Sequence, residues 1–112
     1  MNKNELIMIK IMNELVHIYL NHGCNNVNIN LVFDENKGMV ELQGVVKNID
    51  ESVLNKLKMS LNTPRRDDTE EYYWGLLGSD YSSQLNLLDA MVDEGQLNYE
   101  NGILTLKVIR RF

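Results

Sequence analysis

Residues 27–46 read VNINLVFDENKGMVELQGVV, two alternating runs on either side of a loop of turn-forming residues. Because successive side chains of a strand point to opposite faces, the first run, 27–33, places four apolar side chains on one face. The second run, 39–46, places three apolar side chains, Val40, Leu42 and Val46, on one face. Gly44 inside it predicts either a bulge or a close approach by another part of the chain. The stretch therefore predicts an antiparallel hairpin.

Helical periodicity lies on both sides of this hairpin. Apolar residues recur every three or four positions over 4–22, and Gly23 stands where a helix would end, because glycine accepts the left-handed conformation found there. A second helix is expected over 51–61. A third is expected over 82–94, ended by Gly95.

A second hairpin is predicted near the C-terminus. Strands over 96–99 and 103–109 flank Asn101 and Gly102, a pair that tolerates the positive φ angles of a tight turn. Residues 62–79 have no period and are interpreted as a long loop. The order α-β-β-α-loop-α-β-β predicts an α+β two-layer sandwich, with a mostly antiparallel sheet and three helices on one face.

Length and composition narrow the class of protein. The 112 residues suit one domain, 1–112. A net charge of −5 disfavours nucleic acid as a ligand, since phosphate binding needs a basic surface. A single cysteine excludes an intrachain disulfide and fits a reducing compartment. No secretory signal or membrane span is evident, so a cytoplasmic location without membrane attachment is expected.

The order of elements resembles the GHKL superfamily of ATPases, and most closely the anti-sigma-factor serine kinases and the ATP-binding domains of sensor histidine kinases. Three stretches carry the likeness, which covers nearly the whole chain; the third includes the hairpin that follows it. Residues 14–16 with 22–23 are similar to the end of the family's first helix, which commonly finishes in His-Gly. Residues 44–48 correspond to the strand that enters the adenine-binding motif. Residues 85–94 resemble the helix after the lid, and 101–102 the turn of the closing hairpin.

The resemblance also implies which residues should bind Mg-ATP, and the first two motifs depart from it. The family's first helix carries a glutamate and, four residues later, an asparagine that holds Mg²⁺; here these positions are Glu14 and Ile18. The family's adenine-reading aspartate is replaced by Lys47, which has donors only, and the following glycine by Ile49.

The third motif, a Gly-x-Gly that cradles phosphate, falls on Ser82 and Gln84. Gly75 and Gly78 lie a few residues earlier and are weak candidates for a displaced phosphate loop. With all three motifs altered, no cofactor is expected. The one residual catalytic candidate is Glu14.

Two other groups of residues are candidates for function. His17, His22 and Cys24 cluster in sequence, but the two histidines lie about 140° apart around a helix, so no metal site is expected. The aromatic run 72–74 (Tyr72, Tyr73 and Trp74) is interpreted as a hydrophobic plug over the sheet or as an exposed surface for a protein partner.

The sequence thus predicts a bacterial-type, non-catalytic regulatory domain that interacts with another protein, for example in a phosphorelay or a sigma-factor switch. Two alternatives stay open. One is a divergent ATP-binding protein or serine kinase that uses Glu14, the Gly75–Gly78 loop, ATP and Mg²⁺. The other is a small-ligand sensor that uses the vacated nucleotide pocket.

Overall fold

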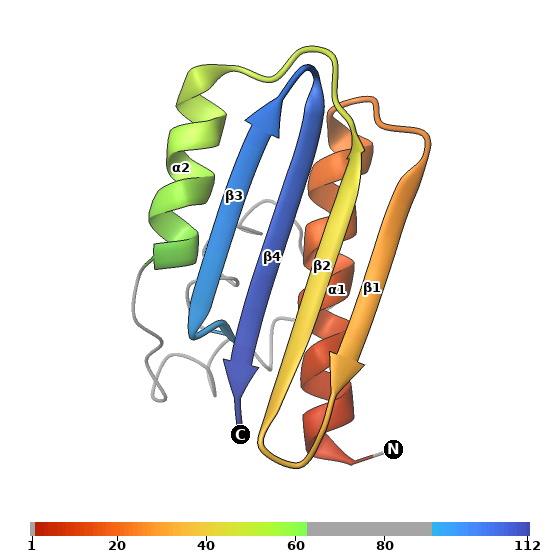
Figure 1. The fold of residues 1–112 in the computed structure, drawn as a ribbon, viewed down its shortest axis with the longest axis vertical. Coiled ribbons are helices and arrows are strands. Elements are labelled where there is room, and N and C mark those ends of the chain that lie inside the picture. The colour runs from red at the N-terminus through yellow and green to blue at the C-terminus, as the bar shows by residue number, and fades with distance from the viewer. Residues whose placement is uncertain (1, 63–90) are drawn as a thin grey trace.

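The structure, a computed structural model, describes residues 2–62 and 91–112. In chain order these residues form α1 (Lys3–Asn21), β1 (Val27–Phe33), β2 (Lys37–Val45), α2 (Glu51–Asn62), β3 (Glu94–Glu100) and β4 (Ile103–Arg111). The strands build one antiparallel sheet in the order β1-β2-β4-β3 (Figure 1). The predicted α+β class is confirmed, and the two hairpins share a sheet because β2 pairs with β4.

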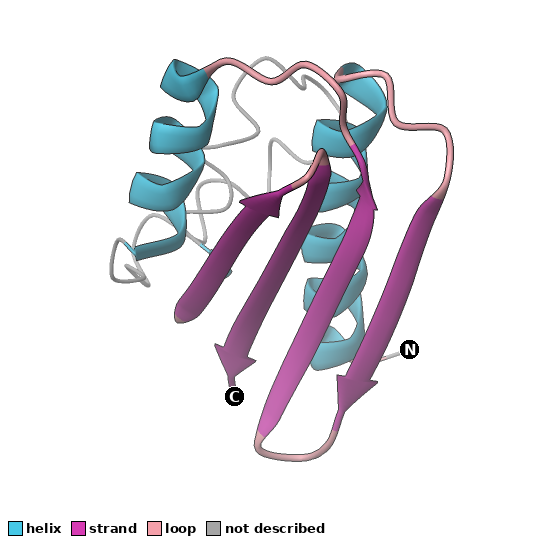
Figure 2. Cartoon of the chain, turned by 45° about the horizontal axis from the view of Figure 1, so that its top comes forward, coloured by secondary structure: helices cyan, strands magenta, loops and turns pink. Residues whose placement is uncertain are grey.

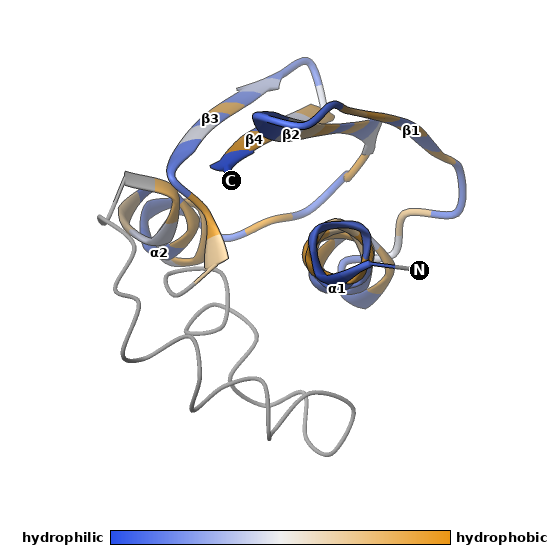
Figure 3. Ribbon diagram, turned by 90° about the horizontal axis from the view of Figure 1, so that it is seen from below, coloured by the Kyte–Doolittle hydropathy of each residue, from blue (hydrophilic) through white to orange (hydrophobic). Residues whose placement is uncertain are grey.

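Both helices lie on the same face of the sheet (Figure 2). Seen along the strands in Figure 3, α1 lies under the β1–β2 side and α2 beside β3, while the opposite sheet face carries no helix of the described residues. The core fills the space between the layers. It consists of the apolar stripe of α1, the inward positions of β2 and β4, and residues of α2, including Ile11, Leu15, Val40, Leu42, Leu57, Leu61, Leu104, Leu106 and Val108.

The ends of α1 follow from local chemistry. The side chain of Asn2 caps the first turn, its Oδ1 accepting a hydrogen bond from the Glu5 N–H at 2.8 Å. At the other end Gly23 has φ of +80°, the left-handed conformation expected of the glycine that ends a helix. The second hairpin turns at Asn101 and Gly102, with φ angles of +52° and +78°, as the sequence predicts.

Gly44 does not introduce a bulge, because the β1–β2 pairing runs without interruption from Val27↔Gly44 to Phe33↔Gly38. The alternative, a close approach, is confirmed. A Cβ built at Gly44 would lie 2.7 Å from the Cys24 Sγ and 3.4 Å from the Tyr19 ring. The glycine gives the Cys24 thiol and the Asn26 carbonyl room to lie against the strand.

The end of the third predicted helix is wrong. Residues 82–90 lie outside the described residues, but Val92 and Asp93 are not helical and Glu94 already belongs to β3. Gly95 therefore does not end a helix. It lies inside β3 against α2, where a Cβ would be 2.5 Å from that of Leu61. From Gly95 to Glu100 the residues alternate between the two faces of the sheet. This strand pattern, and not the helical spacing predicted over 82–94, decides the structure at Glu94 and Gly95.

β3 is longer than the predicted 96–99, and β2 and β4 also extend beyond the predicted 39–46 and 103–109, although β2 ends one residue earlier than predicted, at Val45. β2 begins at Lys37 and β4 ends at Arg111, because these two residues pair across the ladder. The predicted loop over 62–79 falls outside the described residues after Asn62. Neither described helix is long and apolar enough to cross a membrane.

Candidate functional site

The carboxyl group of Glu14 is the residual catalytic candidate, and Glu14 is one of the buried residues of α1. The residue is only 3% exposed. Its Oε2 atom meets no hydrogen-bond partner in the part of the chain that the structure describes. Burial raises the pKa of Glu14, and the nearby charges of His17 and Lys10 offset part of that rise. The side chain is therefore a desolvated acid.

Ile18 lies one turn further along α1, on the same side of the helix as Glu14. It is 5% exposed and belongs to the core cluster. Its side chain contributes hydrocarbon where a Mg²⁺ ion requires oxygen ligands. The α1 face that carries the buried acid therefore has no metal ligand at this position.

Lys47 lies just past the end of β2, on the surface. The residue before it, Val46, is buried, and both its N–H and its carbonyl group form hydrogen bonds. Its N–H donates to the Gly102 carbonyl, and its carbonyl accepts a hydrogen bond from the Tyr99 hydroxyl. The strand end is thus fixed, and the ammonium group of Lys47 lies in solvent.

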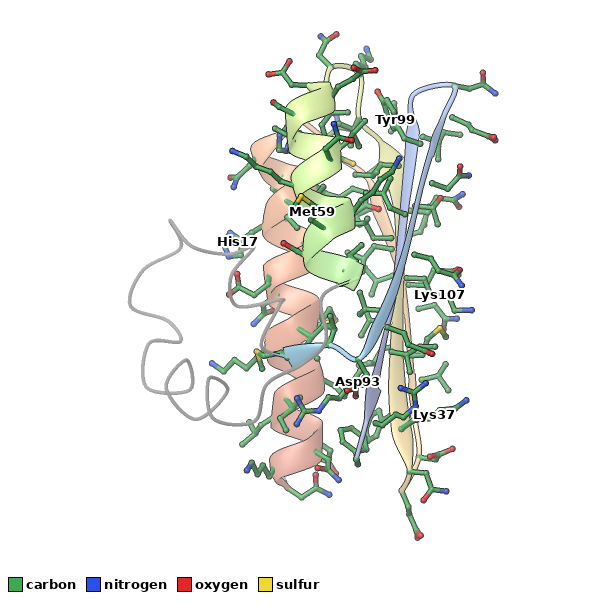
Figure 4. The ribbon with its side chains drawn as sticks, turned by 90° about the vertical axis from the view of Figure 1, so that its left-hand side faces the viewer. His17, Lys37, Met59, Asp93, Tyr99 and Lys107 are labelled. Carbon is green, nitrogen blue, oxygen red and sulfur yellow. The ribbon has the colours of Figure 1, made fainter. Side chains whose placement is uncertain are left out.

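The histidine and cysteine cluster at the end of α1 serves local structure. The Nδ1 atom of His22 lies 2.8 Å from the Ile18 carbonyl oxygen and so bonds the last turn. The Cys24 thiol is buried and lies 3.5 Å from the Asn26 carbonyl oxygen. Figure 4 shows His17 on the side of α1 away from the sheet. Over residues 2–62 and 91–112, no group of three His, Cys, Asp or Glu side chains could hold a metal ion.

Tyr19 is a polar group that sequence reasoning treats only as part of an apolar stripe. Its hydroxyl lies 2.9 Å from the Leu42 carbonyl oxygen and 2.7 Å from the Leu104 carbonyl oxygen. Burial raises the pKa of this phenol, so it stays protonated and donates. Its two partners lie 23 and 85 positions away in the chain, so no local pattern in the sequence marks this role.

The helix-free face of the sheet carries a shallow pocket of about 260 Å³ that the sequence does not predict. Its floor is a cross-strand row of apolar side chains, Val32, Met39 and Ile109. Lys37 and Lys107 stand beside this row and point away from the helices in Figure 4. Apolar residues at outward-facing strand positions are the signal that could have identified it.

The remaining predicted site residues lie outside the described residues. These are Tyr72, Tyr73, Trp74, Gly75, Gly78, Ser82 and Gln84. Of the predicted nucleotide positions, the structure therefore places Glu14 and Ile18 together on α1 and Lys47 on the surface after β2.

No protein-family model matches the chain. No curated protein is significantly similar to it.

Proposed function

We propose that this chain is a non-catalytic regulatory domain that binds another protein, with a histidine-kinase-type ATPase fold that has lost its nucleotide site. Support for this choice of fold comes from the single antiparallel sheet that holds both hairpins and from the two helices on one of its faces. A fold of this kind can serve many functions. The function is therefore argued from the residues at the expected nucleotide positions.

The observation that carries the proposal is the environment of Ile18. Mg²⁺ is held by oxygen atoms at close to octahedral geometry. The position that would supply one such oxygen holds a hydrocarbon side chain packed in the core. The residues at this position do not fit a Mg-nucleotide. We therefore assign neither ATP hydrolysis nor phosphoryl transfer to this chain.

Lys47 and Glu14 support the same conclusion. An ammonium group cannot accept the hydrogen bond of an adenine amino group, and Lys47 is exposed. Glu14 is nearly enclosed, whereas a general base must come within hydrogen-bond reach of the proton that it removes. Neither residue is placed to do what the family's counterpart does.

A protein partner is favoured by the helix-free face of the sheet. On that face the exposed Val32 and the half-buried Met39 lie beside Lys37 and Lys107. An exposed apolar row with a polar rim is typical of a surface that binds a protein. The aromatic run 72–74 remains a second candidate for this role.

The test of the nucleotide claim is a thermal-unfolding and calorimetric titration with a non-hydrolysable ATP analogue and Mg²⁺. We expect no saturable stabilisation of the wild-type protein. A saturable shift would overturn the proposal and favour the divergent ATP-binding protein. Loss of that shift in Glu14→Gln, whose side chain keeps its size, would then assign the nucleotide to α1.

The partner claim is tested with the immobilised protein in extract of its native cell. We expect Trp74→Ala or Met39→Lys to reduce capture of a defined partner while the melting temperature stays near that of the wild type. If both variants capture the partner as well as the wild type, neither surface is the binding site.

A further inference from the structure

The two edges of the sheet differ in how they are protected. Among the described residues β1 has β2 as its only strand neighbour, and it forms the free edge at the right of Figure 1. β3 forms the other edge, where α2 packs against it. β3 also carries Glu94 and Glu100 at its ends. Charged residues and a covering helix are the usual means by which an edge strand avoids pairing with another chain.

Within residues 2–62 and 91–112, β1 has none of these protections. Its sequence, VNINLVF, contains no charged residue, proline or glycine. Its pairing with β2 is regular over all of its residues, so no bulge turns the edge away. Three of its apolar side chains are substantially exposed: Ile29 at 44%, Val32 at 54% and Phe33 at 44%. This edge is ready to accept a further strand.

The hairpin turn shows which backbone groups the edge offers. The Asp34 N–H donates to the Lys37 carbonyl at 2.9 Å, which makes this pair a hydrogen-bonded pair of the ladder. Such pairs alternate along an antiparallel ladder, so Val32, Asn30 and Asn28 bond to β2. The N–H and C=O groups of the odd-numbered residues, Val27, Ile29, Leu31 and Phe33, therefore point toward the open edge.

We infer that β1 pairs antiparallel with β1 of a second copy of this chain, with Asn30 opposite Asn30 at the two-fold axis. In this register Ile29 faces Leu31 of the second copy, and Val27 faces its Phe33. Every outward-pointing N–H and C=O group of β1 then meets a partner. The two sheets become one continuous sheet through an isologous contact.

The pattern of side chains favours a copy of the chain over another partner. The apolar residues of β1 are placed symmetrically about Asn30, so one register brings apolar side chains together along the whole helix-facing side. At a non-hydrogen-bonded pair the opposite side chains are close, and two asparagine amides can each donate and accept.

Charge permits this contact at β1 in particular. The chain has a net charge of −5, so two copies repel each other over most of their surfaces. β1 is an uncharged segment, and it lets two acidic molecules meet without placing like charges in contact. A partner selected by its charge would find no counter-charge on this strand. The inference does not depend on whether the chain binds a nucleotide or another protein.

The experiment measures the mass of the full-length protein by sedimentation equilibrium over a range of concentrations. We expect a reversible dimer. Asn30→Lys places two ammonium groups face to face on the two-fold axis, and we expect it to raise the dimer dissociation constant by roughly tenfold or more. Asn98→Lys is the matched control, because it puts the same charge on the outer face of β3, and it should leave the constant unchanged. Circular dichroism melting confirms that both variants fold.

Cysteine cross-linking then tests the register. In a Cys24→Ala background, which has no other cysteine, Asn30→Cys should form an intermolecular disulfide under mild oxidation, since paired residues at this site lie within bridging distance. Asn28→Cys should not, because its counterpart lies about 13 Å away in this register. A monomeric wild type, a dimer that Asn30→Lys leaves intact, or equal cross-linking at both positions would overturn the inference.

Discussion

The hydroxyl of Tyr19 lies 2.7 Å from the carbonyl oxygen of Leu104, a residue 85 positions further along the chain. The same hydroxyl lies 2.9 Å from the Leu42 carbonyl oxygen. A single side chain of α1 thus touches the backbone of both central strands, β2 and β4, at the point where the two hairpins join. This contact fixes where along the sheet the helix packs.

Replacement of this tyrosine by phenylalanine should be measurable as a loss of stability. Tyr19→Phe removes the hydrogen bond and keeps the ring, so we expect the free energy of unfolding to fall by about 0.5–1.5 kcal/mol in urea titrations. Tyr99→Phe is the control. Its hydroxyl also bonds a carbonyl, that of Val46, but the side chain is only half-buried and the loss should be smaller. An equal or larger effect at Tyr99 would contradict this account of the α1 contact.

Two glycines should differ in their tolerance of a methyl group. A Cβ at Gly95 would lie 2.5 Å from the Cβ of Leu61, an atom fixed to the backbone of α2. A Cβ at Gly38 would also be too close to its neighbour, but that neighbour is the end of the flexible Met8 side chain, with Sδ at 2.4 Å. We therefore expect Gly95→Ala to cost about 1–3 kcal/mol of unfolding free energy and Gly38→Ala less. Thermal melts with matched urea titrations check the order, and the reverse order would show that α2 adjusts more easily than Met8.

The sequence alone predicts those parts of the fold that are determined by neighbouring residues in the chain. The bounds of β1 are correct because its alternation is unbroken from Val27 to Phe33, and the turn at Asn101 and Gly102 follows from their tolerance of positive φ. Gly95 misleads because a glycine after a helical pattern resembles a helix end, whereas its role is to admit Leu61 from α2. That contact joins distant parts of the chain, and no local pattern encodes it.

The candidate site was predictable to a similar extent. The residue types at positions 18 and 47 are enough to argue against a nucleotide site. The burial of Glu14, however, cannot be predicted from its residue type. Glu14 could equally have been a solvated carboxylate of α1, and only tertiary packing encloses it. Val32, Met39 and Ile109 lie on three different strands and form a row only because the strand register places them opposite one another. The sequence does not give that register.

The buried carboxyl of Glu14 should make stability depend on pH in a defined direction. Burial raises its pKa in the folded state, so the folded protein favours the protonated acid. Its contribution is fully present below the pKa of the unfolded chain. It is lost as the pH rises through the folded-state pKa, because ionisation then places a charge in a desolvated site that His17 and Lys10 compensate only in part.

Glu14→Met removes the titrating group and keeps most of the volume. We expect it to stabilise the protein by about 1–3 kcal/mol at neutral pH and to have little effect at low pH, where the wild-type acid is protonated. The measurement is the difference between the two unfolding free energies as a function of pH. A difference that is constant with pH, or that favours the wild type at neutral pH, would show that the carboxylate has a stabilising partner.

The last prediction concerns the position that would hold a metal ion. Ile18→Asn restores the oxygen that the family's motif provides, but it places an amide where a core side chain packs. We expect a loss of about 2–5 kcal/mol in unfolding free energy, as for other large truncations of core residues, because the cavity and the buried amide act together. Lys47→Asp lies on the surface and should change stability by less than about 0.5 kcal/mol. The double variant carries both restored groups, and we expect its melting temperature to stay unchanged when Mg²⁺ and the ATP analogue are added, since Glu14 remains enclosed by the core. A saturable stabilisation of the double variant but not of the wild type would mean that these two substitutions alone had removed a nucleotide site that the rest of the fold still contains.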